Sequence, residues 1–243
     1  MVLLGELLRL SAAAYTRKQV SGRWALSQRF ERRRGFVATL WSSTNSDDRV
    51  LSVRGTKSVR DGLQDLRLLF GKEPRAWREG RDLLRIVQAQ LESSTQLYLT
   101  GHSIGGAYAS AMGAQSSLQT VTFNAPGMRD ALVRSNGHAD WLEQDFPHVL
   151  NVCSSADFIW RLSGPGVSSS RMILRGHRSS SIQRTGIRGV LDAWREEKAP
   201  RRFFQNAMRC HGLHSFSLSE PGGPWRRDVT ALLASSEQEA CAQ

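Results

Sequence analysis

The sequence predicts an α/β protein with a mostly parallel central sheet and helices on both faces. The main observation is that predicted strands and helices alternate along the chain. Short apolar runs typical of buried strands are followed by segments whose apolar residues recur at helical spacing. The second observation is composition, because 40% hydrophobic and 23% charged residues are ordinary values for a globular protein. A chain of 243 residues is long enough for one core. We therefore expect a single domain over residues 1–243.

The predicted elements follow in a regular order along the chain. Residues 1–30 are expected to be helical, beginning with an amphipathic segment that carries Glu6 and Arg9 among leucines. Strands are predicted over residues 35–41, 49–53, 96–100, 118–123 and 149–153. Helices are predicted over residues 59–70, 77–91, 104–112 and 191–208. A segment rich in Ser, Gly and Arg is expected to form a long loop around residues 163–189.

Several features disfavour other classes of protein. No stretch of 18 apolar residues occurs, so we expect no transmembrane helix. No basic segment precedes the apolar N-terminus, so we expect a cytoplasmic protein or one exported without a cleaved signal peptide. The three cysteines form no disulfide or metal-binding pattern: Cys153, Cys210 and Cys241. We expect neither a metal nor an organic cofactor.

The chain is strongly basic, with a formal net charge of +11 and a pI near 10.7. Arginine supplies 29 of the 33 cationic side chains. Such a charge can attract nucleic acid or an anionic membrane surface. The densest clusters are short, at residues 32–34, 201–202 and 226–227, and no nucleic-acid-binding motif accompanies them. A solvated basic surface is therefore favoured over nucleic-acid binding, and contact with anionic membranes stays open.

The most informative stretch covers residues 97–106. It contains Gly101-x-Ser103-x-Gly105, the pattern of a nucleophile elbow, in which a sharp strand-to-helix turn raises a serine hydroxyl above the sheet. The residues two before and two after this serine must be small, because strand and helix nearly touch there. An apolar strand before the motif and a run of small residues after it fit that context. The same turn places the Ile104 N–H at a helix N-terminus, where it can bind an oxyanion.

A serine nucleophile needs a base and an acid that orients the base. On the α/β-hydrolase fold these follow in the order serine, acid, histidine. Asp157 fits the acid, because it lies in the loop after the strand predicted over residues 149–153. Asp140 and Asp145 precede that strand and are expected to be capping or surface carboxylates.

The base must follow Asp157 in the chain, which leaves His177, His211 and His214. His177 lies in the Ser- and Arg-rich segment, whereas His211 and His214 follow a predicted helix, so one of the latter two is the expected base. His102 stands beside the nucleophile and points away from it, so we expect it to pack rather than to react.

Four ordered motifs resemble those of class 3 lipases, the family of the fungal triacylglycerol lipases and many bacterial acyl hydrolases. Residues 101–106 resemble the family's GHSLGG box, with Ile104 in place of Leu. Residues 51–66 resemble its "FRGT…D…DL" segment. Residues 121–127 resemble "TFGAPRVG", with Asn124 where Gly is usual, and residues 151–162 resemble "N…D.V.RLP". The four motifs together are far more specific than any one of them, and they imply the α/β-hydrolase fold.

The resemblance implies a role for each matching residue. Ser103 would be the nucleophile and Asp157 the acid, and Thr56 would supply a second oxyanion donor beside the Ile104 N–H. His211 is the favoured base, because residues 211–216 resemble the histidine-bearing ending of bacterial members, and His214 is the alternative.

The predicted activity is hydrolysis of carboxylic esters of lipids, of lipase or phospholipase type, through an acyl-enzyme. A lipid or a small ester is the expected substrate. Residues 59–70 correspond to the family's lid region, and their many charged side chains disfavour gating at an oil interface. The alternative hypothesis is a basic nucleic-acid-binding or protein-interaction module on a hydrolase-like fold.

Overall fold

The structure is a computed structural model, and it describes part of the chain. The described residues are 1–16, 20, 22–32, 35–55, 75–136, 144–155, 157, 166–167, 170–174, 216 and 227–233. The helices predicted over residues 59–70 and 191–208 lie outside the described residues.

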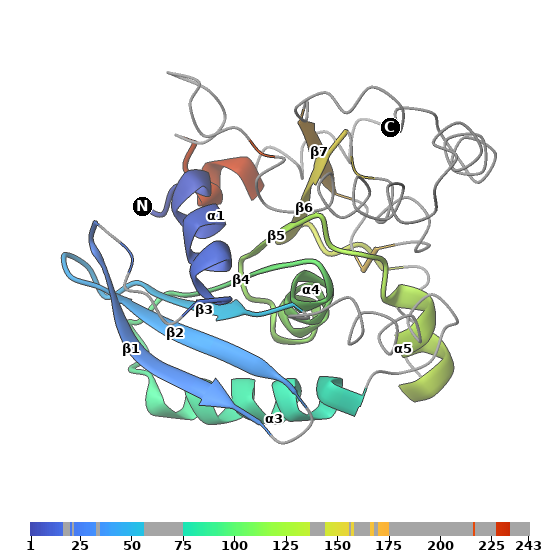
Figure 1. The fold of residues 1–243 in the computed structure, drawn as a ribbon, viewed down its shortest axis with the longest axis horizontal. Helices are drawn as coiled ribbons and strands as arrows, with labels where there is room; N and C mark the ends of the chain where they lie inside the picture. Colours follow the sequence, from blue (N-terminus) through green and yellow to red (C-terminus); the bar gives the residue numbers. More distant parts are fainter. Residues whose placement is uncertain are drawn as a thin grey trace, which may run out of the picture.

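The described strands form one seven-stranded sheet whose spatial order is the order along the chain (Figure 1). Pairing is antiparallel from β1 to β3 and parallel from β3 to β7. The predicted mostly parallel sheet is thereby confirmed. The strands are β1 (Trp24–Glu31), β2 (Val37–Ser43), β3 (Arg49–Val53), β4 (Leu97–His102), β5 (Thr120–Phe123), β6 (Val149–Ser154) and β7 (Arg171–Leu174).

Helices cover both faces of this sheet, as predicted. Helix α1 (Leu4–Ala13) packs on one face, and α3 (Arg75–Gln90) and α4 (Ile104–Ser116) pack on the other (Figure 1). A further helix, α5 (Arg129–Asn136), follows β5. Within the described residues, no helix has the combination of length and apolarity that crossing a bilayer requires.

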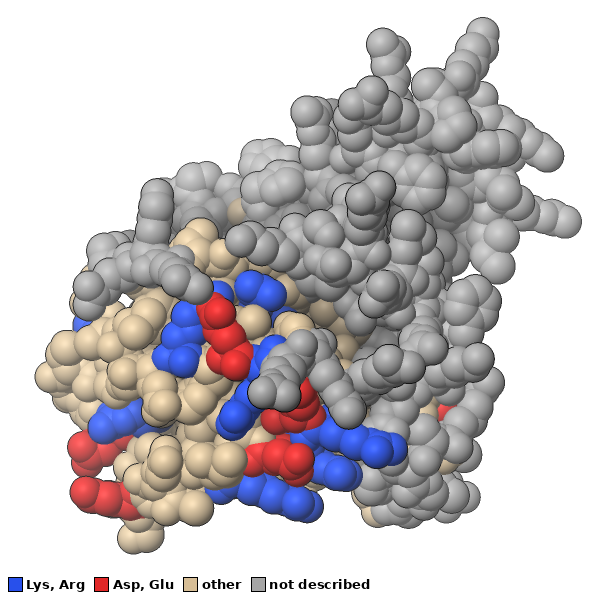
Figure 2. Space-filling model, turned by 60° about the horizontal axis from the view of Figure 1, so that its bottom comes forward, with Lys and Arg blue, Asp and Glu red and all other residues tan. Residues whose placement is uncertain are grey.

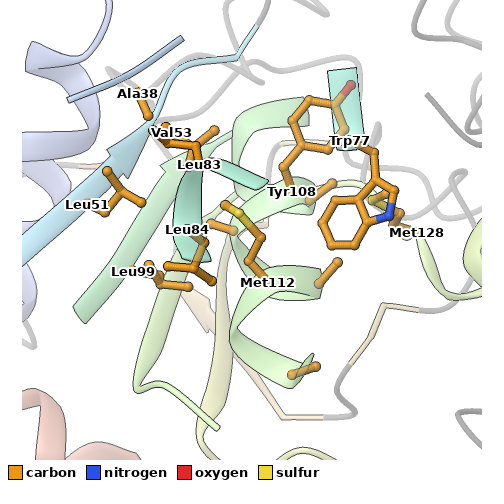
Figure 3. Close-up of a cluster of buried hydrophobic side chains, with 14 of the residues drawn as sticks. Ala38, Leu51, Val53, Trp77, Leu83, Leu84, Leu99, Tyr108, Met112 and Met128 are labelled. Carbon is orange, nitrogen blue, oxygen red and sulfur yellow. The ribbon is translucent and has the colours of Figure 1, made fainter. Parts of the chain in front are cut away.

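Strand alternation divides the buried side chains into two cores. Because successive side chains of a strand point to opposite faces, Leu97 and Leu99 belong to one core and Tyr98 to the other. In the core beneath α3 and α4, Leu99 lies among Leu84 and Met112 (Figure 3). On the opposite face, Tyr98 shares a core with the leucines of α1. Both cores hold β4 in place, and β4 is the strand that leads into the predicted elbow.

Two expectations about secondary structure were wrong. Residues 1–30 are not all helical, because β1 begins at Trp24. The register of β1 against β2 shifts between Leu26 and Gln28, and such a bulge breaks the two-residue alternation that would have indicated a strand. Residues 163–189 are not simply a loop, because β7 lies within them. β7 has only four residues, too few for a recognisable alternation of apolar and polar side chains in the sequence. Its pairing with β6 identifies it as a strand.

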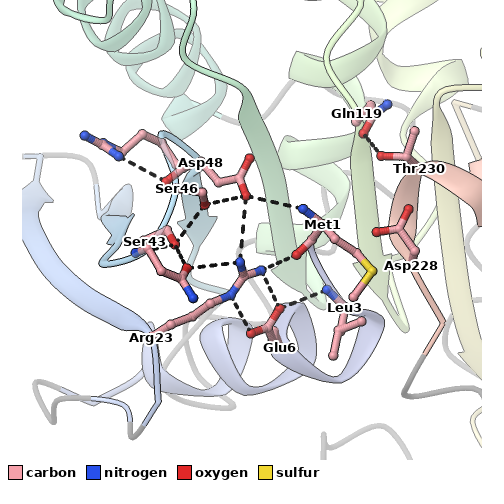
Figure 4. A network of polar contacts seen from close by, with 12 residues as sticks. Met1, Leu3, Glu6, Arg23, Ser43, Ser46, Asp48, Gln119, Asp228 and Thr230 are labelled. Carbon is pink, nitrogen blue, oxygen red and sulfur yellow. Dashed lines mark hydrogen bonds and ion pairs between the residues drawn. The ribbon is translucent and has the colours of Figure 1, made fainter.

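A polar network fixes the start of α1 to the antiparallel part of the sheet (Figure 4). The Arg23 guanidinium donates to both carboxylate oxygens of Glu6, each at 3.0 Å, and its Nη1 lies 3.9 Å from Asp48 Oδ2. The Leu3 N–H donates to Glu6 Oε2 at 2.9 Å. The network therefore joins α1, the start of β1 and the turn between β2 and β3.

Candidate active site

The predicted elbow is a sharp turn between β4 and α4. Ser103 has φ 57° and ψ −135°, a backbone conformation that non-glycine residues rarely adopt. Its N–H donates to the Phe123 carbonyl at 3.1 Å, and its carbonyl accepts from the Ala107 N–H at 3.1 Å. The strained residue is thus held by β5 on one side and by the first turn of α4 on the other.

The flanking glycines are required by close packing, as the motif predicts. A Cβ at Gly101 would lie 2.7 Å from the carbonyl carbon of Gly105. A Cβ at Gly105 would lie 2.5 Å from the carbonyl carbon of Arg54 and 2.6 Å from the N of Gly55. These contacts involve backbone atoms, which cannot turn aside as a flexible side chain can. The strand, the helix and the segment after β3 therefore meet at Ser103 with no room for another methyl group.

The predicted oxyanion donor, the Ile104 N–H, lies at the N-terminus of α4. Ile104 begins the helix directly after Ser103, and its side chain is buried. The first N–H groups of a helix have no partner within the helix, and the helix dipole adds partial positive charge there. A negative oxygen formed at Ser103 would therefore lie beside donors that are already fixed in direction.

Asp157 lies at the same edge of the sheet as Ser103. It follows β6, its N–H donates to the Ser154 carbonyl at 3.1 Å, and its side chain is only 1% exposed. β4, β5 and β6 are neighbours and run parallel, so their carboxyl ends lie side by side. With about 4.8 Å between neighbouring strands, the loops after β4 and β6 are roughly 10 Å apart, a span that one imidazole and its hydrogen bonds can bridge.

Asn124 and Asn151 order the loops at this edge. Asn124, the departure from the glycine of the family motif, has φ 48° and is fully buried, and its Oδ1 accepts from the Ser154 N–H at 2.8 Å. Asn151 Nδ2 donates to the Ala125 carbonyl at 2.9 Å, and its Oδ1 accepts from the Ala125 N–H at 3.2 Å. Both amides tie the segment after β5 to β6, the strand that leads to Asp157.

The structure brings a residue to the elbow that sequence reasoning missed. Tyr15 Oη lies 2.9 Å from His102 Nδ1, and the two rings are 5.9 Å apart. His102 itself is buried, in keeping with the expected packing role. The two residues are 87 positions apart, so no spacing in the sequence could have linked them.

The remaining predicted site residues, Thr56, His211 and His214, lie outside the described residues, as does His177. In the part of the chain that the structure describes, no group of three or more His, Cys, Asp or Glu side chains is arranged to hold a metal ion. A small cavity of about 10 Å³, room for one water molecule, lies beside α4 among residues that include Ser110, Asn151 and Val167.

Comparison with known proteins places these features in a family. The pattern of the phospholipase-like family, described as a Tle-like phospholipase domain, matches residues 12–207. Two curated relatives bear the name lipase ATG15. The one from Lodderomyces elongisporus is 36% identical over 100 residues, which cover 41% of this chain and 18% of the relative. The one from Candida albicans is 34% identical over 100 residues, which cover 41% of this chain and 17% of the relative. The matched region thus spans less than a fifth of these relatives.

Solved structures share the fold at low sequence identity. A triacylglycerol lipase from Penicillium expansum has a TM-score of 0.50 at 20% identity, over 77% of this chain and 84% of that one. The Lip2 lipase from Yarrowia lipolytica has a TM-score of 0.50 at 14% identity, over 71% and 78% of the two chains. The α/β-hydrolase fold is thereby confirmed. Because the family pattern covers most of its length, the chain belongs to the phospholipase-like family with a Tle-like phospholipase domain.

Proposed function

We propose that this protein is a serine hydrolase that cleaves carboxylic esters of lipids, with phospholipids as the first substrate class to test. The observation that carries the proposal is the strained backbone of Ser103 between a buried parallel strand and a helix N-terminus. This geometry places a half-buried serine at the N-terminus of a helix, and it supports the proposal because acyl transfer needs a serine hydroxyl beside fixed N–H donors.

In the proposed mechanism, a histidine takes the Ser103 proton while Ser103 Oγ attacks the ester carbonyl. The Ile104 N–H and Thr56 donate to the oxyanion, and the leaving alcohol departs with the proton from the histidine. Water, activated by the same histidine, then hydrolyses the acyl-enzyme. We assign the base to His211, with His214 as the alternative, and the orienting acid to Asp157. The burial of Asp157 supports this role, because a carboxylate shielded from water orients an imidazolium more strongly.

The family supports a lipid substrate, since its pattern is that of a phospholipase domain and the curated relatives are named lipases. The charge supports contact with an anionic membrane surface. The described residues hold 14 Arg and 11 Asp or Glu, a formal net charge of only +3, whereas the whole chain carries +11. Figure 2 accordingly shows both signs of charge mixed on the face that it presents. Residues 158–226 alone contain 12 Lys or Arg and 4 Asp or Glu.

The test of the proposal is Ser103→Ala, with Ser110→Ala as the matched control. Ser110 is a buried serine within α4, bonded to Thr122 Oγ1 at 3.2 Å and outside the proposed machinery. We expect Ser103→Ala to lower hydrolysis of a p-nitrophenyl ester and of phospholipid vesicles by about 10³-fold or more, with a thermal midpoint close to that of the wild type. Ser110→Ala should keep its activity, and a fluorophosphonate probe should label it. Hydrolysis or labelling that survives Ser103→Ala would overturn the assignment.

The same assays separate the two candidate bases. His211→Ala should lower kcat about as strongly as Ser103→Ala, because residues that act as one unit do not contribute additively. His214→Ala should leave kcat within a few-fold of the wild type. The reverse result would transfer the base to His214 and leave the proposed reaction unchanged.

A further inference from the structure

The hydroxyl of Tyr15 lies where three segments of the chain meet. Tyr15 follows the end of α1, and its Oη is 2.9 Å from His102 Nδ1 and 3.4 Å from the His102 carbonyl oxygen. The backbone of Gly55, two residues after β3, lies against this phenolic oxygen, because a Cβ added at Gly55 would overlap it. One hydroxyl therefore contacts both the residue before Ser103 and the residue before Thr56.

The contact is tight because Gly55 is pressed against the elbow. A Cβ added at Gly55 would lie 2.7 Å from the His102 carbonyl oxygen and 3.3 Å from Ser103 Cβ, and it would overlap the Tyr15 hydroxyl. Glycine at this position lets the segment after β3 reach the elbow, and the hydroxyl joins the two. Any shift of this segment would move Gly55 relative to Ser103.

The end of α1 that carries Tyr15 is itself anchored. Ser11 Oγ and Thr100 Oγ1 are 2.8 Å apart, and both side chains are fully buried, which ties α1 to β4. At the residue before Tyr15, Arg29 Nη1 donates to the Ala14 carbonyl at 3.1 Å, which ties the end of α1 to β1. The hydroxyl is therefore presented from a fixed point of the fold.

The hydroxyl stays protonated under ordinary conditions. Burial raises the pKa of Tyr15 above its usual value, although the Gly55 N–H and the nearby Arg54 lower it in part. A neutral phenol has one proton to donate and can also accept, so its hydroxyl can bond to His102 Nδ1 at 2.9 Å and to the His102 carbonyl oxygen at 3.4 Å. The hydroxyl is therefore bonded to His102 and packed against the backbone of Gly55.

We propose that Tyr15 is a positioning residue for acyl transfer, whose hydroxyl holds the Arg54–Gly55 segment against the nucleophile elbow; this segment precedes Thr56 in the chain, the oxyanion donor assigned in the proposed function. This inference rests on the proposed function. Tyr15 acts through Gly55 and His102, and it needs no contact with the substrate. An oxyanion donor stabilises charge that appears only in the transition state, so its misplacement lowers kcat and leaves KM nearly unchanged.

The test is Tyr15→Phe, which keeps the ring and removes only the hydroxyl. Tyr98→Phe is the matched control, because Tyr98 is a buried tyrosine of β4 whose side chain lies in the core beneath α1 and near Thr230 rather than at the elbow. We expect Tyr15→Phe to lower kcat for a soluble p-nitrophenyl ester by about 10- to 100-fold, with KM within twofold. The inhibition constant of an alkyl boronic acid, which forms a tetrahedral adduct with the serine, should rise by a similar factor. Tyr98→Phe should change neither quantity.

Each outcome decides the inference. A Tyr15→Phe enzyme with wild-type kcat and boronate affinity would overturn it, and so would a loss that appears in KM alone or equally in Tyr98→Phe. If Tyr15→Phe fails to fold, Gly55→Ala is the second variant, because its methyl group would push the segment from the elbow while keeping the hydroxyl. Unchanged kcat in Gly55→Ala would then overturn the inference. An active Ser103→Ala would instead defeat the proposed function, so the two failures are distinguishable.

Discussion

At the scale of single residues, Asn124 shows how a departure from a family motif is accommodated. The family motif has glycine here, and the observed φ of 48° explains why, since glycine enters this left-handed region without steric cost. Asparagine is among the residues that tolerate this conformation, and its side chain adds a bond to the Ser154 N–H. Asparagine in place of glycine therefore loses conformational freedom of the backbone but gains a hydrogen bond between the end of β5 and β6, the strand that leads to Asp157.

This exchange predicts the order of stability of two variants. Asn124→Ala loses the 2.8 Å bond to the buried Ser154 N–H and keeps a Cβ in the left-handed region. We expect its free energy of unfolding to fall by about 2–3 kcal/mol. Asn124→Gly loses the same bond but relieves the backbone, so it should be about 1 kcal/mol more stable than Asn124→Ala. Urea denaturation of the three proteins measures this, and equal midpoints for the two variants would contradict it.

At the scale of elements, α1 is held to the sheet by polar contacts as well as by its leucines. Burial by itself would raise the pKa of the Glu6 carboxyl, but hydrogen bonds from Arg23 and from the Leu3 N–H outweigh burial and lower the pKa. Because this pKa is lower in the folded than in the unfolded state, the stabilisation is fully present above the unfolded value near 4.5. It is lost as the pH falls through the folded value.

We therefore expect Glu6→Gln to be destabilised at pH 7 by about 2 kcal/mol, since it leaves Arg23 without its carboxylate. The difference from the wild type should shrink as the pH falls below about 4.5. Glu31→Gln is the matched control, because Glu31 pairs with Arg29 at 2.9 Å but is 47% exposed, and such pairs contribute little. Thermal midpoints measured between pH 7 and pH 3 test this, and a constant difference over that range would refute it.

At the scale of the whole molecule, the basic charge is unevenly distributed. The described residues carry a formal net charge of +3, and most of the excess lies in other parts of the sequence, above all residues 158–226. A mixed surface such as that in Figure 2 gives little long-range attraction, whereas a concentrated basic segment is attracted to anionic lipid.

This distribution predicts a salt effect that depends on the substrate. Hydrolysis of anionic phospholipid vesicles should fall several-fold between 50 and 300 mM salt, because the Debye screening length shortens markedly over this range. Hydrolysis of a neutral soluble ester should change little. Replacing Arg201 and Arg202 together by Gln should weaken only the vesicle activity. Replacing the exposed Arg85 of α3 by Gln serves as the control. Equal salt dependence for both substrates would mean that the charge has no role at the lipid surface.

The sequence by itself determined the elements whose signals are local. The strands around β3 to β6, the helix after Ser103, the glycines of the elbow and the resemblance to class 3 lipases are confirmed, because buried parallel strands and a nucleophile elbow impose residue types at fixed short spacings. The roles of Ser103, Asp157, Thr56, Ile104 and His211 stay predictions.

Only the tertiary structure decided the features that depend on contacts between distant residues. β1 and β7 are edge strands whose pairing partners define them, and the bulge in β1 hides its alternation. From the sequence, Asn124 is only a departure from the glycine of the family motif. Its left-handed backbone conformation and its bond to β6 give the physical reason why asparagine fits there. Tyr15 carries no motif at all, yet the packing of α1 on β4 brings its hydroxyl to His102 across 87 residues. Local patterns encode which elements form, and packing decides which side chains meet.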